Sequence, residues 1–122
     1  MTTKRSLVGS FKFQLRTLLT MVAILWAIEI VDFVAFDGAL NNFGIRPRQV
    51  SGLWGILFAP FLHGDFLHLI ANTLPLISMG WLIMLRDDTD LVPVTIITAL
   101  VGGLGTWLIG SSGVHIGASG VI

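Results

Sequence analysis

Three long apolar stretches constrain the fold of this chain more than any other feature. They lie near residues 17–36, 66–85 and 91–110, and each approaches the length of about 20 residues that a helix needs to cross the hydrocarbon core of a bilayer. Within lipid, a spanning segment must pair its own backbone polar groups, so each stretch is expected to be helical. The sequence therefore predicts an all-α, multi-pass membrane protein.

The composition agrees with a membrane protein. Hydrophobic residues occupy 54% of the 122 positions and charged residues 11%, whereas soluble domains carry about 25% charged residues. The formal net charge is zero, which gives no indication of nucleic-acid binding. Cysteine is absent, so any nucleophile must be an oxygen. No metal and no organic cofactor is expected.

Basic residues predict the orientation in the membrane. Four of the seven Lys and Arg residues fall in a basic lead over residues 1–16, and such residues usually stay in the cytoplasm. The first apolar stretch exceeds the roughly 7 to 15 residues of a signal peptide, so it is expected to be retained. Three crossings then place residues 110–118, and a fourth span beginning near Ser119, on the outer side of the plasma membrane.

The connection over residues 37–65 is too apolar for an ordinary loop. Proline and glycine divide it into short pieces. It carries Trp54, Phe58, Phe61 and Leu62, and aromatic and apolar side chains of this kind anchor at headgroup depth. We therefore expect this segment to be partly immersed in the outer leaflet.

Two polar residues mark the start of the second span. His68 and Asn72 are four residues apart, which places them on one face of a helix. Polar side chains in a membrane usually face the bundle interior, where they either join helices or form a functional site, and the pattern leaves both roles open. Asp65 precedes the same apolar run and is expected to cap the helix.

Ser119 stands among small residues, in the sequence GASG formed by Gly117, Ala118, Ser119 and Gly120. At the start of a helix, such a serine has an uncrowded hydroxyl and unpaired backbone N–H groups beside it, as in an oxyanion site. The alternative is a helix cap with glycines that permit close packing. The topology predicts that Ser119 lies close to His68 and Asn72 at the start of the second span.

The third span carries a seam of small residues. Gly102, Thr106 and Gly110 recur every four residues and therefore lie along one side of a helix. Small side chains let neighbouring helices approach closely. We expect this seam to help hold the start of the fourth span against the second.

Taken together, these motifs resemble those of the rhomboid intramembrane serine proteases. The resemblance rests on HGDFLHLIAN, on GASG and on the long first loop with GIRPR, and it covers residues 17–122. It implies a rhomboid-type helix bundle with Ser119 as nucleophile, supported by Gly117 and Gly120. His68, Asn72 and the Ser119 backbone N–H would stabilise the oxyanion. Substrates would be single-span membrane proteins cleaved near the outer face.

The resemblance also implies a missing part. In this family the general base is a histidine on the sixth membrane helix, and the sequence ends at Ile122. The chain is therefore interpreted as the amino-terminal portion of a longer enzyme, truncated at the start of the fourth membrane helix and inactive alone, because a serine hydroxyl needs a base. His115 is a less favoured base, since residues 116–118 are not expected to be helical. His63 resembles a family histidine without an assigned catalytic role.

Three alternatives stay open. A catalytically inactive rhomboid-like protein that binds membrane proteins for quality control would share the fold. A transporter fragment could use Glu29 and Asp32, three residues apart in the first span, although their place near its outer end favours a structural role. A zinc site of three histidines, His63, His68 and His115, is disfavoured because their spacing does not match a zinc helix.

Overall fold

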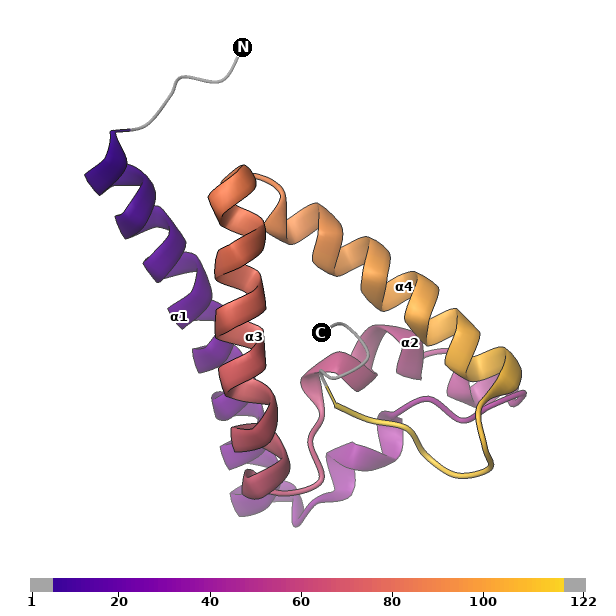
Figure 1. Cartoon of the computed structure of the whole chain (residues 1–122). Helices are drawn as coiled ribbons and strands as arrows, with labels where there is room; N and C mark the ends of the chain where they lie inside the picture. The colour runs from indigo at the N-terminus through magenta and orange to yellow at the C-terminus, as the bar shows by residue number, and fades with distance from the viewer. Residues whose placement is uncertain (1–5, 118–122) are drawn as a thin grey trace.

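Three long helices dominate the computed structural model, which describes residues 6–117. Each of them is long and apolar enough to cross a membrane. They are α1 (Leu7–Val31), α3 (Phe66–Arg86) and α4 (Leu91–Ile109) (Figure 1). The predicted all-α, multi-pass class is confirmed.

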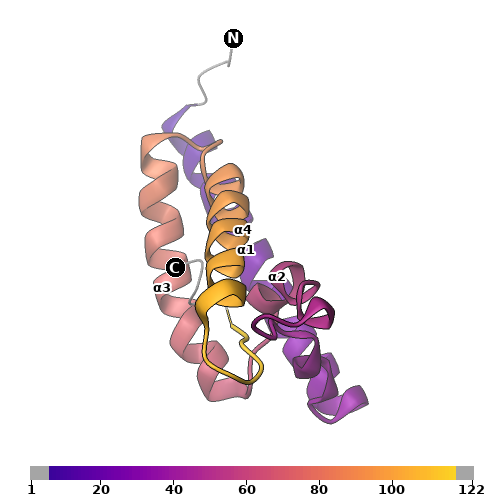
Figure 2. The ribbon, with the colours of Figure 1, turned by 90° about the vertical axis from the view of Figure 1, so that its right-hand side faces the viewer.

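Helices α1 and α3 run side by side, whereas α4 leaves the end of α3 at an angle (Figure 1). The far half of α4 instead contacts the short helix α2 (Gly55–Phe58). Figure 2 shows most of the 37–65 segment on the same side of α4 as α2, before the chain crosses to α3. This segment also contains three 3-10 turns, at Ala39–Phe43, Val50–Gly52 and Ala59–Phe61.

Helix α1 begins well before residue 17, where the first span was expected to start. The Ser6 hydroxyl caps it by accepting a hydrogen bond from the Gly9 N–H at 3.0 Å. Lysine and arginine are good helix formers, so the basic residues after Gly9 do not interrupt the helix. At its other end α1 continues into a π-helical turn, Asp32–Phe36, and stops where Asp37 adopts a left-handed φ of 51°. Which residues of α1 lie within the membrane stays a prediction.

Apolar side chains pack α1 against α3 in two clusters. One contains Leu25, Leu69 and Leu76, and the other joins Leu18 to Met84 and Leu91. In lipid these contacts stabilise the helix pair by close packing rather than by removal from water. Together they set the position of α3, whose first turn carries His68.

Polar side chains add hydrogen bonds between the same two helices. The Trp26 indole N–H donates to the Thr73 hydroxyl at 3.1 Å. Gln14, which is buried, accepts from the Trp81 indole at 3.1 Å and donates to the Asp88 carboxylate at 2.8 Å. Gln14 therefore ties α1 to both α3 and the turn that leads into α4.

Arg48 closes the carboxyl end of α4. Its backbone N–H donates to the Trp107 carbonyl at 2.8 Å, and its guanidinium donates to the carbonyls of Leu108 and Gly110 at 3.2 and 2.9 Å. The last carbonyls of a helix lack partners within the helix and attract a cation. One arginine of the 37–65 segment thus fixes that segment to α4.

One expectation about the side chains of this segment needs correction. Trp54, Phe58 and Phe61 expose 67%, 45% and 43% of their surface, but Leu62 exposes only 6%. The expectation that Leu62 anchors at headgroup depth is therefore wrong, because the chain turns inward there on its way to α3.

The small-residue seam of α4 faces the 37–65 segment. A Cβ atom on Gly110 would lie 3.1 Å from Pro47, and Gly102 and Thr106 border a cavity shared with Ile56. The seam thus allows close packing, as expected, but its neighbour among the described residues is this segment rather than α3. Its predicted contact with a fourth span falls outside those residues.

We predict that Gln14→Leu destabilises the protein by about 1–2 kcal/mol, because it removes a buried amide that bonds both the Trp81 indole and the Asp88 carboxylate. The measurement is the free energy of unfolding in detergent micelles. Thr20→Val on the same helix is the control, since the Thr20 hydroxyl is exposed and bonds only the Arg16 carbonyl. Equal stability of the two variants would contradict the assigned role of Gln14.

Candidate active site

His68 lies in the first turn of α3, and its backbone is fixed on both sides. The Asp65 carboxylate accepts a hydrogen bond from the His68 N–H at 2.7 Å, which confirms the predicted helix cap. One turn later the Asn72 side-chain amide donates to the His68 carbonyl at 2.8 Å. His68 is half-buried and Asn72 is buried, so the two share an inward face as predicted.

The His68 imidazole is held by residues that precede the helix. The Gly64 N–H donates to its Nδ1 at 3.2 Å. The ring of His63 packs edge-on against it, with centroids 5.1 Å apart and planes at 67°. His63 is completely buried. Burial, and secondarily the neighbouring His68, lower the pKa of His63 from 6.5 to about 4, so its imidazole is neutral at pH 7.

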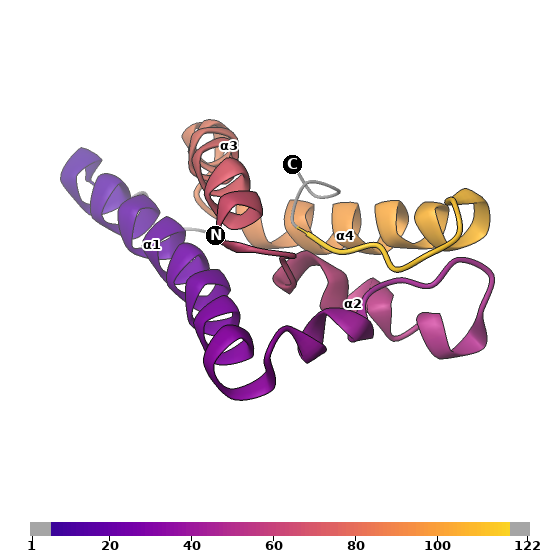
Figure 3. The ribbon, with the colours of Figure 1, turned by 90° about the horizontal axis from the view of Figure 1, so that it is seen from below.

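Residues 115–117 are fastened to the 37–65 segment by backbone hydrogen bonds. After α4 the chain turns back along the helix toward the centre of the molecule (Figure 3). There His115 and Ile45 form an antiparallel bridge with N–O distances of 2.8 and 2.9 Å. Further on, the Gly117 N–H donates to the Ala59 carbonyl at 2.8 Å.

Gly117 lies directly against the His68 imidazole. A Cβ atom at this position would come within 2.8 Å of Cε1 and 2.9 Å of Nε2 of His68, and the φ of Gly117 is +107°. Only glycine allows both this close approach to the imidazole and this positive φ without strain. The structure therefore brings the first residue of the GASG motif to His68. Ala118, Ser119 and Gly120 lie outside the described residues, so the position of Ser119 stays a prediction.

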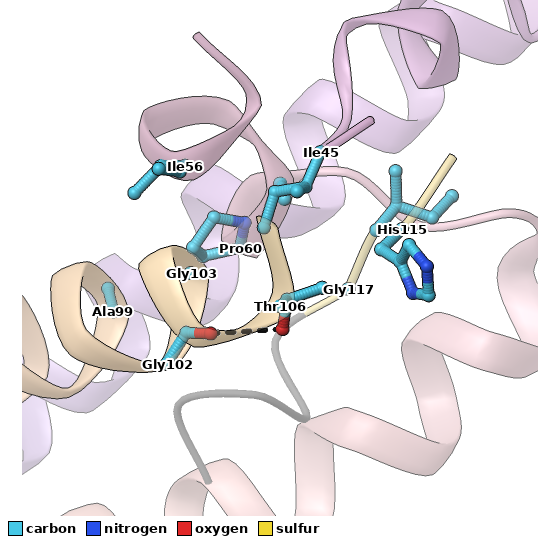
Figure 4. Close-up of a pocket in the computed structure, with 11 residues that line it drawn as sticks. Ile45, Ile56, Pro60, Ala99, Gly102, Gly103, Thr106, His115 and Gly117 are labelled. Atoms are coloured by element: carbon cyan, nitrogen blue, oxygen red, sulfur yellow. Dashed lines mark hydrogen bonds between the residues drawn. The ribbon is translucent and has the colours of Figure 1, made fainter. Parts of the chain in front are cut away.

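A cavity of about 150 Å³ adjoins Gly117 on the side of α4 (Figure 4). Its wall is largely apolar and includes Ile45, Ile56 and Pro60. The Thr106 hydroxyl on its border donates to the Gly102 carbonyl at 2.9 Å and is therefore already bonded. Gly117 therefore borders open space on one side and His68 on the other.

Two further polar candidates, His115 and Asp32, have structural partners. The His115 Nε2 lies 2.8 Å from the Ser111 carbonyl, to which it can only donate. Asp32 is buried and accepts a hydrogen bond from the Leu40 N–H at 2.9 Å, so it stabilises the turn after α1. Within residues 6–117, no three His, Asp or Glu side chains gather as a metal site would require.

The fold and this site together define a class: a multi-pass helical membrane protein with a His/Asn pair at the entry of one span and a glycine-rich turn beside it. A family model described as the rhomboid domain matches residues 50–122. The chain belongs to the rhomboid family.

Relatives of the chain come from mycobacteria. The uncharacterized proteins Rv1337 of Mycobacterium tuberculosis and Mb1372 of Mycobacterium bovis are each 46% identical over 112 residues, covering 87% of this chain and 46% of theirs. The uncharacterized protein ML1171 of Mycobacterium leprae is 43% identical over 112 residues, covering 87% and 44%. The chain thus spans less than half the length of these relatives. No solved structure matches it significantly.

Sequence reasoning missed the two contacts that hold the His68 ring. The sequence assigns His63 no catalytic role, and it gives Gly64 no function beyond that of the other glycines that divide the 37–65 segment. The spacing of five residues between the histidines, with a glycine and a helix cap between them, was the available signal. It was too weak, because the ring contact depends on how the chain turns before α3.

We predict that stability falls as the pH decreases from about 6.5 toward 4. Over that range an unfolded His63 binds a proton while the buried one, with its pKa of about 4, does not, so protons favour the unfolded state. The measurement is the midpoint of thermal unfolding against pH, compared with His63→Gln. A variant that retains the full slope of the wild-type protein would rule out His63 as its source.

We further predict that Gly117→Ala destabilises the protein more than Gly113→Ala does. Both glycines have a positive φ, +107° and +115°, so each alanine introduces a similar backbone strain of about 1 kcal/mol. A Cβ at Gly113 meets nothing within 4 Å, whereas one at Gly117 strikes His68. The collision should add about 1–3 kcal/mol. The measurement is the free energy of unfolding of each variant. Equal values would refute the contact between Gly117 and His68.

Proposed function

We propose that this rhomboid-family chain is part of an intramembrane serine endopeptidase in which Ser119 is the nucleophile. The observation that carries the proposal is the contact between Gly117 and the His68 imidazole. Gly117 precedes Ser119 by two residues, and the proposal puts a carbonyl that reacts with the Ser119 hydroxyl within range of the His68 side chain. Membership of the rhomboid family supports the same assignment.

His68 and Asn72 serve as oxyanion donors in this proposal. Attack by the Ser119 hydroxyl on a peptide carbonyl places negative charge on the carbonyl oxygen, and fixed N–H donors aimed at it each contribute about 3–4 kcal/mol. The Asn72 amide has two N–H groups, of which one donates to the His68 carbonyl and the other stays available. The Ser119 backbone N–H is the third donor.

The general base is proposed to come from a histidine outside the present sequence. A serine hydroxyl becomes an effective nucleophile only when a base accepts its proton. His115 is a poor candidate, because residues 115–117 are not helical, so a spacing of four residues does not bring its ring beside Ser119. After attack, the base gives its proton to the leaving amine as the C–N bond breaks and the acyl-enzyme forms. Water, deprotonated by the same base, then attacks the acyl-enzyme, and the proton returns to the Ser119 oxygen as the acid product leaves.

The substrates are proposed to be membrane proteins whose helix unwinds near the outer face of the plasma membrane. This placement follows from the basic lead, which predicts a cytoplasmic amino terminus. His68 then lies at the outer end of α3, where water can reach the acyl-enzyme. The apolar cavity beside Gly117 is compatible with an apolar substrate segment.

Labelling with a fluorophosphonate tests the nucleophile. In membranes containing the full-length protein we expect labelling that Ser119→Ala abolishes and that Ser112→Ala, a change of an exposed serine in the preceding loop, leaves intact. His68→Ala and Asn72→Ala should each slow labelling by about 10²–10³-fold. The 122-residue chain alone should label weakly. Absence of labelling in wild-type protein would contradict the assignment and favour an inactive rhomboid-like protein.

A further inference from the structure

We propose that Gly64 is a positioning residue whose backbone N–H fixes the His68 imidazole in the tautomer that carries its proton on Nε2. The inference rests on the proposed function in one respect: in that function, the Nε2 proton of His68 is donated to the oxyanion. Its basis is the hydrogen bond of 3.2 Å between the Gly64 nitrogen and His68 Nδ1.

The tautomer follows from the chemistry of the two partners. A neutral imidazole has one nitrogen that donates and one that accepts. A backbone N–H can only donate, so the Nδ1 atom that faces Gly64 must be the acceptor. The ring proton is therefore on Nε2. A hydrogen bond to one ring nitrogen sets the role of the other in this way.

The protonated nitrogen is directed toward the GASG motif. Nε2 and Cε1 are the His68 atoms on the side of Gly117, since a Cβ atom built on Gly117 would lie 2.9 Å from Nε2 and 2.8 Å from Cε1. If the proton were on Nδ1, the imidazole would present a lone pair to the motif and would repel an oxyanion. The Gly64 hydrogen bond thus makes His68 a donor on the side where a donor is required.

Neighbouring groups keep the ring from turning over. The buried His63 ring packs edge-on against the imidazole, with centroids 5.1 Å apart, and opposes its rotation. A ring flip would exchange Nδ1 for a carbon atom and break the bond to Gly64. Because His63 is buried and neutral, it adds no positive charge that would perturb the tautomer.

The test is ¹⁵N NMR of the full-length protein in bilayers, labelled at glycine and histidine, with His68 assigned through His68→Gln. We expect a protonated Nε2, an unprotonated Nδ1, and a coupling between Nδ1 and the Gly64 amide across the hydrogen bond. Gly64→Ala is the matched control: it keeps the N–H, and its Cβ would stay 3.9 Å from Nδ1. Gly64→Pro removes the N–H and should abolish the coupling and mix the two tautomers.

A proton on Nδ1 of wild-type His68, or no coupling to the Gly64 amide, would overturn the inference. So would a Gly64→Pro spectrum identical to that of Gly64→Ala. If the proline variant does not fold, the coupling in the wild-type protein decides alone. These results do not depend on Ser119: a protein that shows the coupling but no fluorophosphonate labelling would retain the tautomer assignment and lose the protease function.

Discussion

Backbone hydrogen bonds between residues 115–117 and the 37–65 segment determine where the GASG motif begins. Both partners are irregular chain in a protein of the membrane, where backbone groups without water must find partners in the protein. Ile45 pairs with His115, and the Ala59 carbonyl accepts from Gly117. Without these bonds nothing among the described residues would hold Gly117 at His68. The 37–65 segment is therefore part of the candidate site and not only a connection.

The rest of the structure holds Gly117 and His68 in position relative to each other. On one side, Gln14 and Trp26 join α1 to α3 and so position the helix that carries His68. On the other side, Arg48 binds the carboxyl end of α4, from which the chain returns toward Gly117. Directional polar contacts thus fix geometry that apolar packing, which has no preferred direction, would leave loose.

The long helices and the shared face of His68 and Asn72 could be predicted because they depend on length, hydropathy and helical period alone. The Asp65 cap was predictable for the same local reason. The start of α1 was not, because Lys and Arg mark an orientation without ending a helix. Burial of Leu62 and the hydrogen bond from Gly64 to His68 depend on how an irregular segment folds, and no periodic pattern encodes that. Gly117 was singled out as part of a motif, but its contact with His68 needed three-dimensional structure.

The central claim is that a carbonyl bound at Ser119 meets donors from His68 and Asn72. An experimental structure of the full-length protein with a phosphonate bound to Ser119 tests it most directly. The account predicts a phosphonate oxygen within about 3 Å of His68 Nε2 and of the Asn72 amide nitrogen. A phosphonate oxygen directed away from both side chains, or Ser119 at the opposite end of the bundle from His68, would contradict it.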